Sequence, residues 1–182
     1  MEASGRRLGQ PERGMPPVRG ALVERLLWPL AAGWIGGFLG NALLGAAFSS
    51  PPIRAVLYHP DWQSRLFIDI TPQRDIAVSV IGLVVLSGLH GVLYRQLAPS
   101  IPGRTWVAKG LAWGVMLWAL YWLFQEWFIY VTLLKEPIAL ALVELAILLA
   151  GSLLEGMVIA GLLSGTSIAA PRVKMSTEQK SD

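Results

Sequence analysis

Four long apolar segments constrain this chain more than any other feature of its sequence. They run from Leu26 to Phe48, from Ile76 to Tyr94, from Thr105 to Leu134 and from Pro137 to Ser164. Of the 15 basic and 12 acidic side chains, only Lys109, Glu126, Glu144 and Glu155 fall inside them. A helix that crosses the hydrocarbon core of a bilayer needs about 20 mostly apolar residues. The sequence therefore predicts an integral membrane protein rather than a soluble domain.

The same segments are expected to be helices. Backbone polar groups that face lipid must be satisfied within their own segment, which an α-helix achieves and an open strand does not. The second segment is the shortest, and we expect it to begin at Pro72, where the hydroxyl of Thr71 would cap the helix. The predicted fold is an all-α integral membrane protein, a four-transmembrane-helix bundle with spans of about 26–48, 72–94, 105–134 and 137–164.

The basic residues predict how the bundle is oriented. The amino-terminal arm, the loop between the second and third spans with the start of the third, and the carboxy-terminal tail hold 11 of the 15 lysines and arginines. The positive-inside rule then places both termini in the cytoplasm. A signal peptide cleaved near Ala46 and Ala47 is an alternative. The long apolar stretch and the 25 residues before it favour an uncleaved anchor.

The regions outside the spans differ in character. Residues 1–25 are predicted to form a disordered basic cytoplasmic arm and residues 165–182 a disordered cytoplasmic tail, because neither has an apolar face to bury. Residues 26–164 form the membrane domain. Its outer loop, residues 49–71, is rich in apolar side chains. We expect residues 61–69 of this loop to form a short helix that caps the bundle, while contact with a partner is the alternative.

Several classes of chemistry are excluded by missing residues. The chain has no cysteine, which removes thiol nucleophiles, thiolate metal sites and iron–sulfur clusters. Its two histidines, His59 and His90, are predicted near opposite membrane faces, so they do not form a bis-histidine haem site within one chain. No phosphate-binding loop or zinc-protease motif occurs. We therefore predict no catalytic residue, no metal and no cofactor. The net charge of +3 comes from dispersed cations, so nucleic acid is not an expected partner.

The first segment carries glycines at helical spacing. The pairs Gly33/Gly37 and Gly36/Gly40 each place two small residues four positions apart, on one face of a helix. Without side chains a neighbouring helix can approach closely, and van der Waals contact then drives packing in lipid. The pattern is compatible with packing inside the chain and with a seam between copies.

Polar residues are predicted to meet in the outer half of the membrane. Counted from the turn between the third and fourth spans, Glu126 and Glu144 lie at the same depth, about 13 Å from the turn. Gln125 lies beside Glu126 on a face shared with two tryptophans, and Asn41 of the first span is close in depth. Asn41, Gln125, Glu126 and Glu144 therefore form the candidate polar cluster.

Three interpretations of the two outer carboxyls stay open. Carboxylates that meet in a low-dielectric medium repel unless they share a proton. The pair can therefore be protonated and join helices by hydrogen bonds. It can instead handle protons or cations in a transport path, or accept a cation from a partner. Ionisable residues inside a membrane are often functional, so the transport path and the partner's cation remain open alternatives.

The inner half holds a second group of candidates. Glu155 lies on the same helix face as Glu144, about three turns further along. His90 and Lys109 are the available counter-groups, and either contact would dock helices without catalysis. The functional alternative is an inner station for a proton that enters from the cytoplasm.

These features predict a protein of structural, accessory or regulatory type in the bacterial inner membrane, and not an enzyme. Its expected partner is the lipid bilayer, and a homo-oligomer or a larger membrane complex is compatible with the sequence. An alternative is a small oligomeric transporter or channel that uses Glu126, Glu144 and Glu155. A lesser alternative is a lipid-modifying enzyme at the outer face, which would need acid–base residues such as His59 and Asp61.

Overall fold

The fold is taken from a computed structural model that describes residues 23–165. Four helices in this part of the chain are long and apolar enough to cross a membrane: Arg25–Ser49, Ile76–Leu97, Trp106–Leu134 and Ile138–Ser164. This confirms the all-helical class and the four candidate spans. The predicted basic arm and tail lie outside the described residues, except for residues 23–25 and 165.

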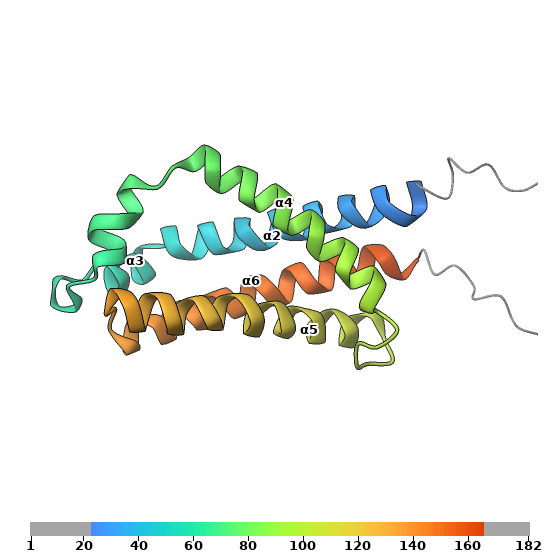
Figure 1. The fold of residues 1–182 in the computed structure, drawn as a ribbon. Helices are drawn as coiled ribbons and strands as arrows, with labels where there is room; N and C mark the ends of the chain where they lie inside the picture. Colours follow the sequence, from blue (N-terminus) through green and yellow to red (C-terminus); the bar gives the residue numbers. More distant parts are fainter. Residues whose placement is uncertain (1–22, 166–182) are drawn as a thin grey trace, which may run out of the picture.

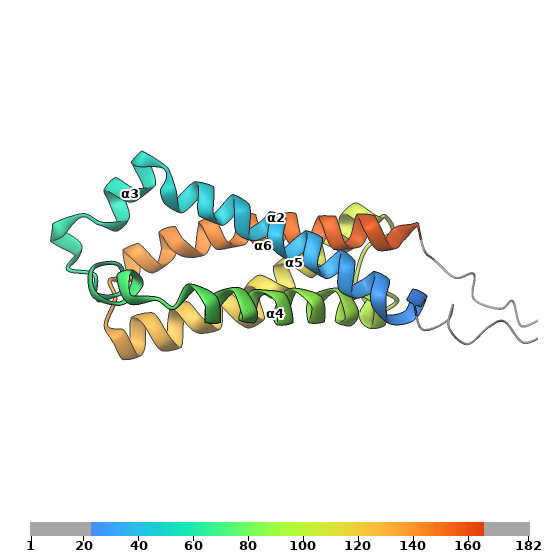
Figure 2. The same cartoon turned by 90° about the horizontal axis from the view of Figure 1, so that it is seen from above.

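Eleven helical elements make up the described chain. In order they are η1 (Val23–Leu27), α2 (Trp28–Ser49), α3 (Pro51–Leu57), η2 (Pro60–Trp62), η3 (Leu66–Ile70), η4 (Thr71–Gln73), α4 (Ile76–Leu97), α5 (Trp106–Leu117), η5 (Trp118–Leu123), η6 (Gln125–Leu134) and α6 (Ile138–Ser164). The long helices run lengthwise through the molecule, and α4 is inclined to the third span (Figures 1 and 2). We call the end that holds α3 and η2–η4 the loop end, and the end where α2 begins and α6 finishes the terminal end.

Glycines determine which helices are neighbours. A Cβ atom on Gly33 would overlap the carbonyl oxygen of Ser87 in α4, and one on Gly37 would overlap the Ser87 hydroxyl. On the other face of α2, a Cβ on Gly36 would lie 2.8 Å from Ile159 Cγ1, and one on Gly40 would lie 2.9 Å from the Gly151 carbonyl, both in α6. Both glycine pairs are thus used for packing within the chain, one against α4 and one against α6.

A further glycine contact joins α5 to α6. A Cβ on Gly110 would lie 2.8 Å from Met157 Cα, and one on Gly114 would lie 2.7 Å from Leu153 Cα. Gly110 and Gly114 have the same four-residue spacing as the glycines of α2. Helix α6 is therefore the centre of the bundle, packed between α2 and α5, while α4 packs mainly on α2.

Helix α4 begins later than predicted. Asp75 caps it, because its Oδ1 accepts the Val78 N–H at 3.1 Å, whereas Thr71 belongs to the separate 3₁₀ turn η4. Arg74 between the two is extended, with ψ of 128°, which interrupts the helix. The prediction of a span from Pro72 was wrong for this reason, and the connection covers residues 50–75 rather than 49–71.

The connection packs against the loop end of the bundle. Leu57, Leu66 and Phe67 are buried together with Leu140 near the start of α6. The predicted continuous helix over residues 61–69 is absent, since Gln63 adopts a left-handed conformation with φ of 49° between η2 and η3. The connection is therefore a folded cover and not a single surface helix.

The third span changes its winding halfway along. It starts as expected, with the Thr105 hydroxyl accepting the Ala108 N–H at 3.2 Å, but η5 and η6 are π-helical. The wider π turn brings side chains five residues apart onto one face. Gln125 Nε2 accordingly donates to the Tyr130 hydroxyl at 2.5 Å. A uniform period of 3.6 residues does not describe this half of the span.

Candidate functional site

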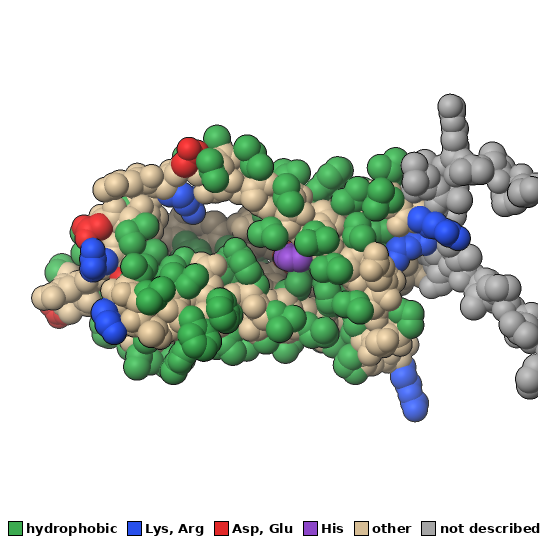
Figure 3. Space-filling model, viewed as in Figure 1, with side chains coloured by type: hydrophobic (Ala, Val, Ile, Leu, Met, Phe, Trp, Pro, Cys, Tyr) green, Lys and Arg blue, Asp and Glu red, His purple; other side chains and the backbone are tan. Residues whose placement is uncertain are grey.

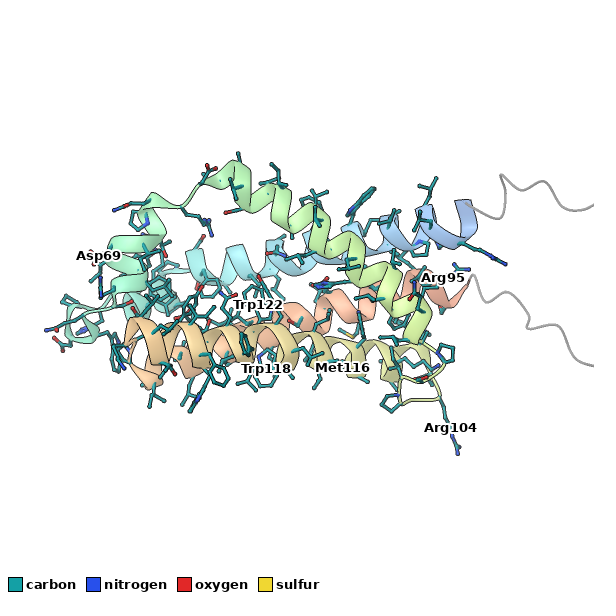
Figure 4. The ribbon with its side chains drawn as sticks, in the orientation of Figure 1. Asp69, Arg95, Arg104, Met116, Trp118 and Trp122 are labelled. Atoms are coloured by element: carbon teal, nitrogen blue, oxygen red, sulfur yellow. The ribbon has the colours of Figure 1, made fainter. Side chains whose placement is uncertain are left out.

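A cavity of about 900 Å³ lies in the loop-end half of the bundle. Its walls come from α2, from the π-helical part of the third span, from α6 and from the folded connection. The residues that line it include Asn41, Arg54, Asp69, Arg74, Trp122, Gln125, Glu126, Tyr130, Glu144 and Leu148. The structure thus brings all four members of the predicted polar cluster around one cavity. Figure 4 labels Trp122 on the third span and Asp69 on the connection.

Glu126 is the most deeply buried carboxyl of this cavity. The residue is 1% exposed, and its Oε2 atom has no hydrogen-bond partner. Placing an unpaired polar atom in a protein interior costs about 1–3 kcal/mol, and more when it is charged. Glu126 therefore has an unpaired acceptor atom that is enclosed by the protein, in a residue that lines the cavity.

The other three members of the polar cluster line the same cavity but differ in their hydrogen bonds. Glu144 is 5% exposed and comes from α6. Asn41 Nδ2 donates to the Gly37 carbonyl of its own helix at 2.9 Å, and Gln125 donates to Tyr130. In residues 23–165, Glu126 and Glu144 make no hydrogen bond to each other, so the hydrogen-bonded carboxyl pair, one of the three interpretations left open, is not formed.

Basic residues lie on the connection side of the cavity. Arg54 and Arg74 both belong to its lining, and the Arg54 guanidinium sits 5.3 Å from the centre of the Tyr58 ring. The two close ion pairs in the described part of the chain are His59–Asp61 and His90–Glu155. Within residues 23–165, neither arginine therefore forms a close ion pair with Glu126 or Glu144. The sequence did not predict that these arginines line a cavity, because a position in a loop does not indicate where the side chain lies in the fold.

Glu136 was also missed. It lies in the turn before α6, is 5% exposed, and its Oε1 accepts the buried Leu66 N–H at 2.8 Å. This bond ties the connection to the turn between the third and fourth spans. A charged residue next to a turn gave no sequence signal for burial.

Replacing Glu136 with alanine is expected to loosen the connection. The Leu66 amide loses its acceptor in a buried position, which costs about 1–3 kcal/mol. We expect hydrogen exchange at residues 64–68 to accelerate at least about fivefold. The Asp61→Ala variant removes an exposed carboxylate from the same connection and serves as the control. Unchanged protection of Leu66 in the Glu136→Ala variant would contradict the anchoring role.

The inner-half candidates divide into two separate contacts. His90 Nδ1 lies 2.7 Å from Glu155 Oε1, so this pair joins α4 to α6. Lys109 Nζ instead donates to the carbonyl of Ala98 at 2.5 Å. Ala98 caps the end of α4, where a cation also interacts favourably with the helix dipole. Of the two predicted counter-groups for Glu155, His90 is thus the one in contact.

The terminal end is closed by apolar packing. Ala32, Tyr94, Trp113, Ile159 and Ala160 belong to one buried cluster that joins all four long helices. A smaller cavity of about 420 Å³ near this end is lined by Arg95, Arg104 and Lys109. Figure 4 shows Arg95 and Arg104 there, far from Asp69. The two cavities are therefore separated by the packed half of the bundle.

The chain was compared with protein-family models, with curated proteins and with solved structures, and none of the three comparisons found a match.

Proposed function

We propose that this chain is a multi-pass membrane protein of accessory or regulatory type that binds a positively charged organic group in its loop-end cavity. The carrying observation is the buried carboxyl of Glu126, whose Oε2 has no hydrogen-bond partner, in the wall of a cavity that Glu144, Asn41 and Gln125 also line. A buried carboxyl in low-dielectric surroundings is stabilised by a proton, by a cation or by hydrogen-bond donors, and no side chain within residues 23–165 donates a hydrogen bond to the Glu126 Oε2.

The size of the cavity favours an organic ligand over a bare ion. Its volume of about 900 Å³ lies within the range of roughly 300–1,000 Å³ that is typical of small-molecule sites. No group of three acidic or histidine residues suited to a metal ion occurs within residues 23–165. Trp122 and Tyr130 add aromatic faces, which attract ammonium groups.

The geometry favours binding over the other functions considered. The carboxyls do not join helices through a mutual hydrogen bond, which weakens a purely structural role. The cavity lining ends at the level of Asn41, Trp122 and Leu148, and a buried apolar cluster separates it from the smaller cavity near the terminal end, so a continuous transport path has no support. His59 and Asp61 are exposed and lie outside the lining, so the proposed binding site does not include the acid–base residues that an outer-face enzyme would need.

The same proposal includes the membrane location of the protein and its orientation. The distribution of basic residues supports a bacterial inner-membrane location with cytoplasmic termini, so that the loop-end cavity opens to the outer half of the bilayer. The glycine pairs of α2 are occupied within the chain and therefore lend no support to a homo-oligomer through that face.

Calorimetric titration of the full chain in nanodiscs tests the proposed binding. The probe is phenethylammonium, and 2-phenylethanol is its uncharged counterpart of similar shape. We expect the ammonium to bind at least about tenfold more tightly than the alcohol, because a hydrogen bond to a charged group contributes about 1.5–3 kcal/mol. The Glu126→Gln/Glu144→Gln variant should lose this preference.

The Asp61→Asn variant is the matched control, because it removes an exposed carboxylate that does not line the cavity. It should bind the ammonium as the unmodified protein does. Equal affinity of the unmodified protein for ammonium and alcohol would overturn the proposal without reliance on any variant.

A further inference from the structure

The loop-end half of α4 has no packing partner. Residues 76–83 contain no buried side chain, and Ile76, Val78 and Ile81 are 70%, 64% and 65% exposed. The contact with α2 begins near Val84, whose carbonyl accepts the Trp34 indole N–H at 2.9 Å. Towards the loop end from there, α4 diverges from the third span (Figure 1). We call residues 76–83 the free half of α4.

The divergence leaves a side opening to the cavity. The lining includes residues of α2, the third span, α6 and the connection, but none of α4. Figure 3 shows the molecule hollowed between the loop-end part of α4 and the helices opposite. Because the free half of α4 is part of a candidate span, the opening faces the hydrocarbon of the bilayer rather than water.

Charge distinguishes this side route from the route through the connection. A cation that arrives from water at the loop end would pass Arg54 and Arg74, which repel it, and one acidic residue, Asp69, so that the charged residues lining that side of the cavity are positive on balance. The free half of α4 contains no charged residue, so this wall of the side opening adds no charge, and Arg74 lies two residues before it. A ligand that uses this opening needs an apolar part to enter the membrane and a cationic part for Glu126 and Glu144.

We infer that the loop-end cavity receives a long-chain amine sideways from the outer leaflet, through the opening between the free half of α4 and the third span. The protonated primary amine lies at Glu126 and Glu144, which accept its N–H groups. The alkyl chain extends through the opening and covers exposed apolar side chains of α4. This inference rests on the proposed binding of an organic cation and adds the ligand class and its route.

Comparison of three probes in nanodiscs of phosphatidylcholine tests the ligand class. Dodecylammonium carries both expected parts, dodecanol lacks the charge, and phenethylammonium lacks the long chain. At equal mole fraction in the bilayer, dodecylammonium should bind at least about tenfold more strongly than dodecanol, and the Glu126→Gln/Glu144→Gln variant should abolish the difference. Dodecylammonium should also compete with phenethylammonium for the cavity.

A fluorophore placed on α4 tests the route. The chain has no cysteine, so Ile81→Cys gives one labelling site on the free half of α4, and Leu111→Cys gives one on the lipid-exposed part of α5 as a control. A dodecylammonium with a quencher on its chain should quench the label at residue 81 more than at residue 111. The glutamine double variant should remove that excess.

Each outcome decides between the two proposals. If phenethylammonium binds and dodecylammonium gains nothing over it, the long-chain inference is overturned while the cavity proposal stands. If neither amine binds, both are overturned. Glutamate-dependent binding without excess quenching at residue 81 rejects the side route. Disulfide formation between two Ile81→Cys chains would show that a second copy covers α4, and would also reject it.

Discussion

The Gly33→Ala variant is expected to lose about 1–3 kcal/mol of stability, as overpacking of a tightly packed interior typically does. A Cβ atom at residue 33 would overlap the backbone carbonyl of Ser87, and it would lie 2.9 Å from the Gly91 nitrogen. Both neighbours are backbone atoms that cannot rotate away, so α2 and α4 must separate. Unfolding of the purified chain by titration with sodium dodecyl sulfate measures the effect.

Gly82→Ala is the matched control, because it adds the same methyl group to α4. No atom lies within 4 Å of a Cβ built there. Alanine is favoured over glycine in a helix interior by about 1 kcal/mol, so this variant should be unchanged or slightly more stable. The two substitutions thus have opposite expected signs. Equal stability of both variants would show that close contact at Gly33 does not hold α4 on α2.

The His90→Leu variant is expected to lose about 3–5 kcal/mol, the largest effect we predict. Its imidazole lies 2.7 Å from Glu155, and the two side chains are only 20% and 11% exposed. Removing the imidazole leaves Glu155 without its partner between α2 and α6, where a Cβ on Gly40 would already lie 3.2 Å from the Glu155 Cβ. An unpaired buried carboxylate is costly because the surrounding low dielectric does not stabilise its charge.

A double-mutant cycle separates the pair from simple packing. The His90→Leu/Glu155→Leu variant removes both polar groups, and such replacements cost much less than removing one partner. We therefore expect the double variant to be more stable than His90→Leu alone. Glu155→Gln keeps an acceptor for the imidazole and should cost less than His90→Leu. If the double variant is as unstable as the sum of the single ones, the contact contributes nothing specific.

Part of the candidate site was accessible from the sequence. The depths of Glu126 and Glu144 follow from counting residues from the turn that their helices share, and that of Asn41 follows from counting from the outer end of the first span; all three line the same cavity. The pairing of Glu155 with His90 was one of two options that depth allowed. Depth alone could not choose between His90 and Lys109, because the choice depends on where each side chain points: Lys109 donates to the Ala98 carbonyl, whereas His90 contacts Glu155.

Other parts of the site could not be read from local patterns. The π-helical winding of η6 brings Gln125 to Tyr130, whereas a regular α-helix would direct these side chains apart. Arg54, Arg74 and Glu136 have ordinary loop and turn surroundings in the sequence. Only the path of the folded connection shows that two of them line the cavity and that the third anchors Leu66.

The sequence by itself determined the class of the protein. Length and lack of charge are properties of each segment alone. Because a charged side chain in lipid is energetically costly, these two properties are enough to identify four candidate spans. The tertiary structure decided which polar groups share a cavity and where that cavity opens. These depend on how closely and at what angle helices cross, which is set by contacts such as Gly33 with Ser87. The same crossing that holds α4 at its terminal half lets its free half diverge from the third span.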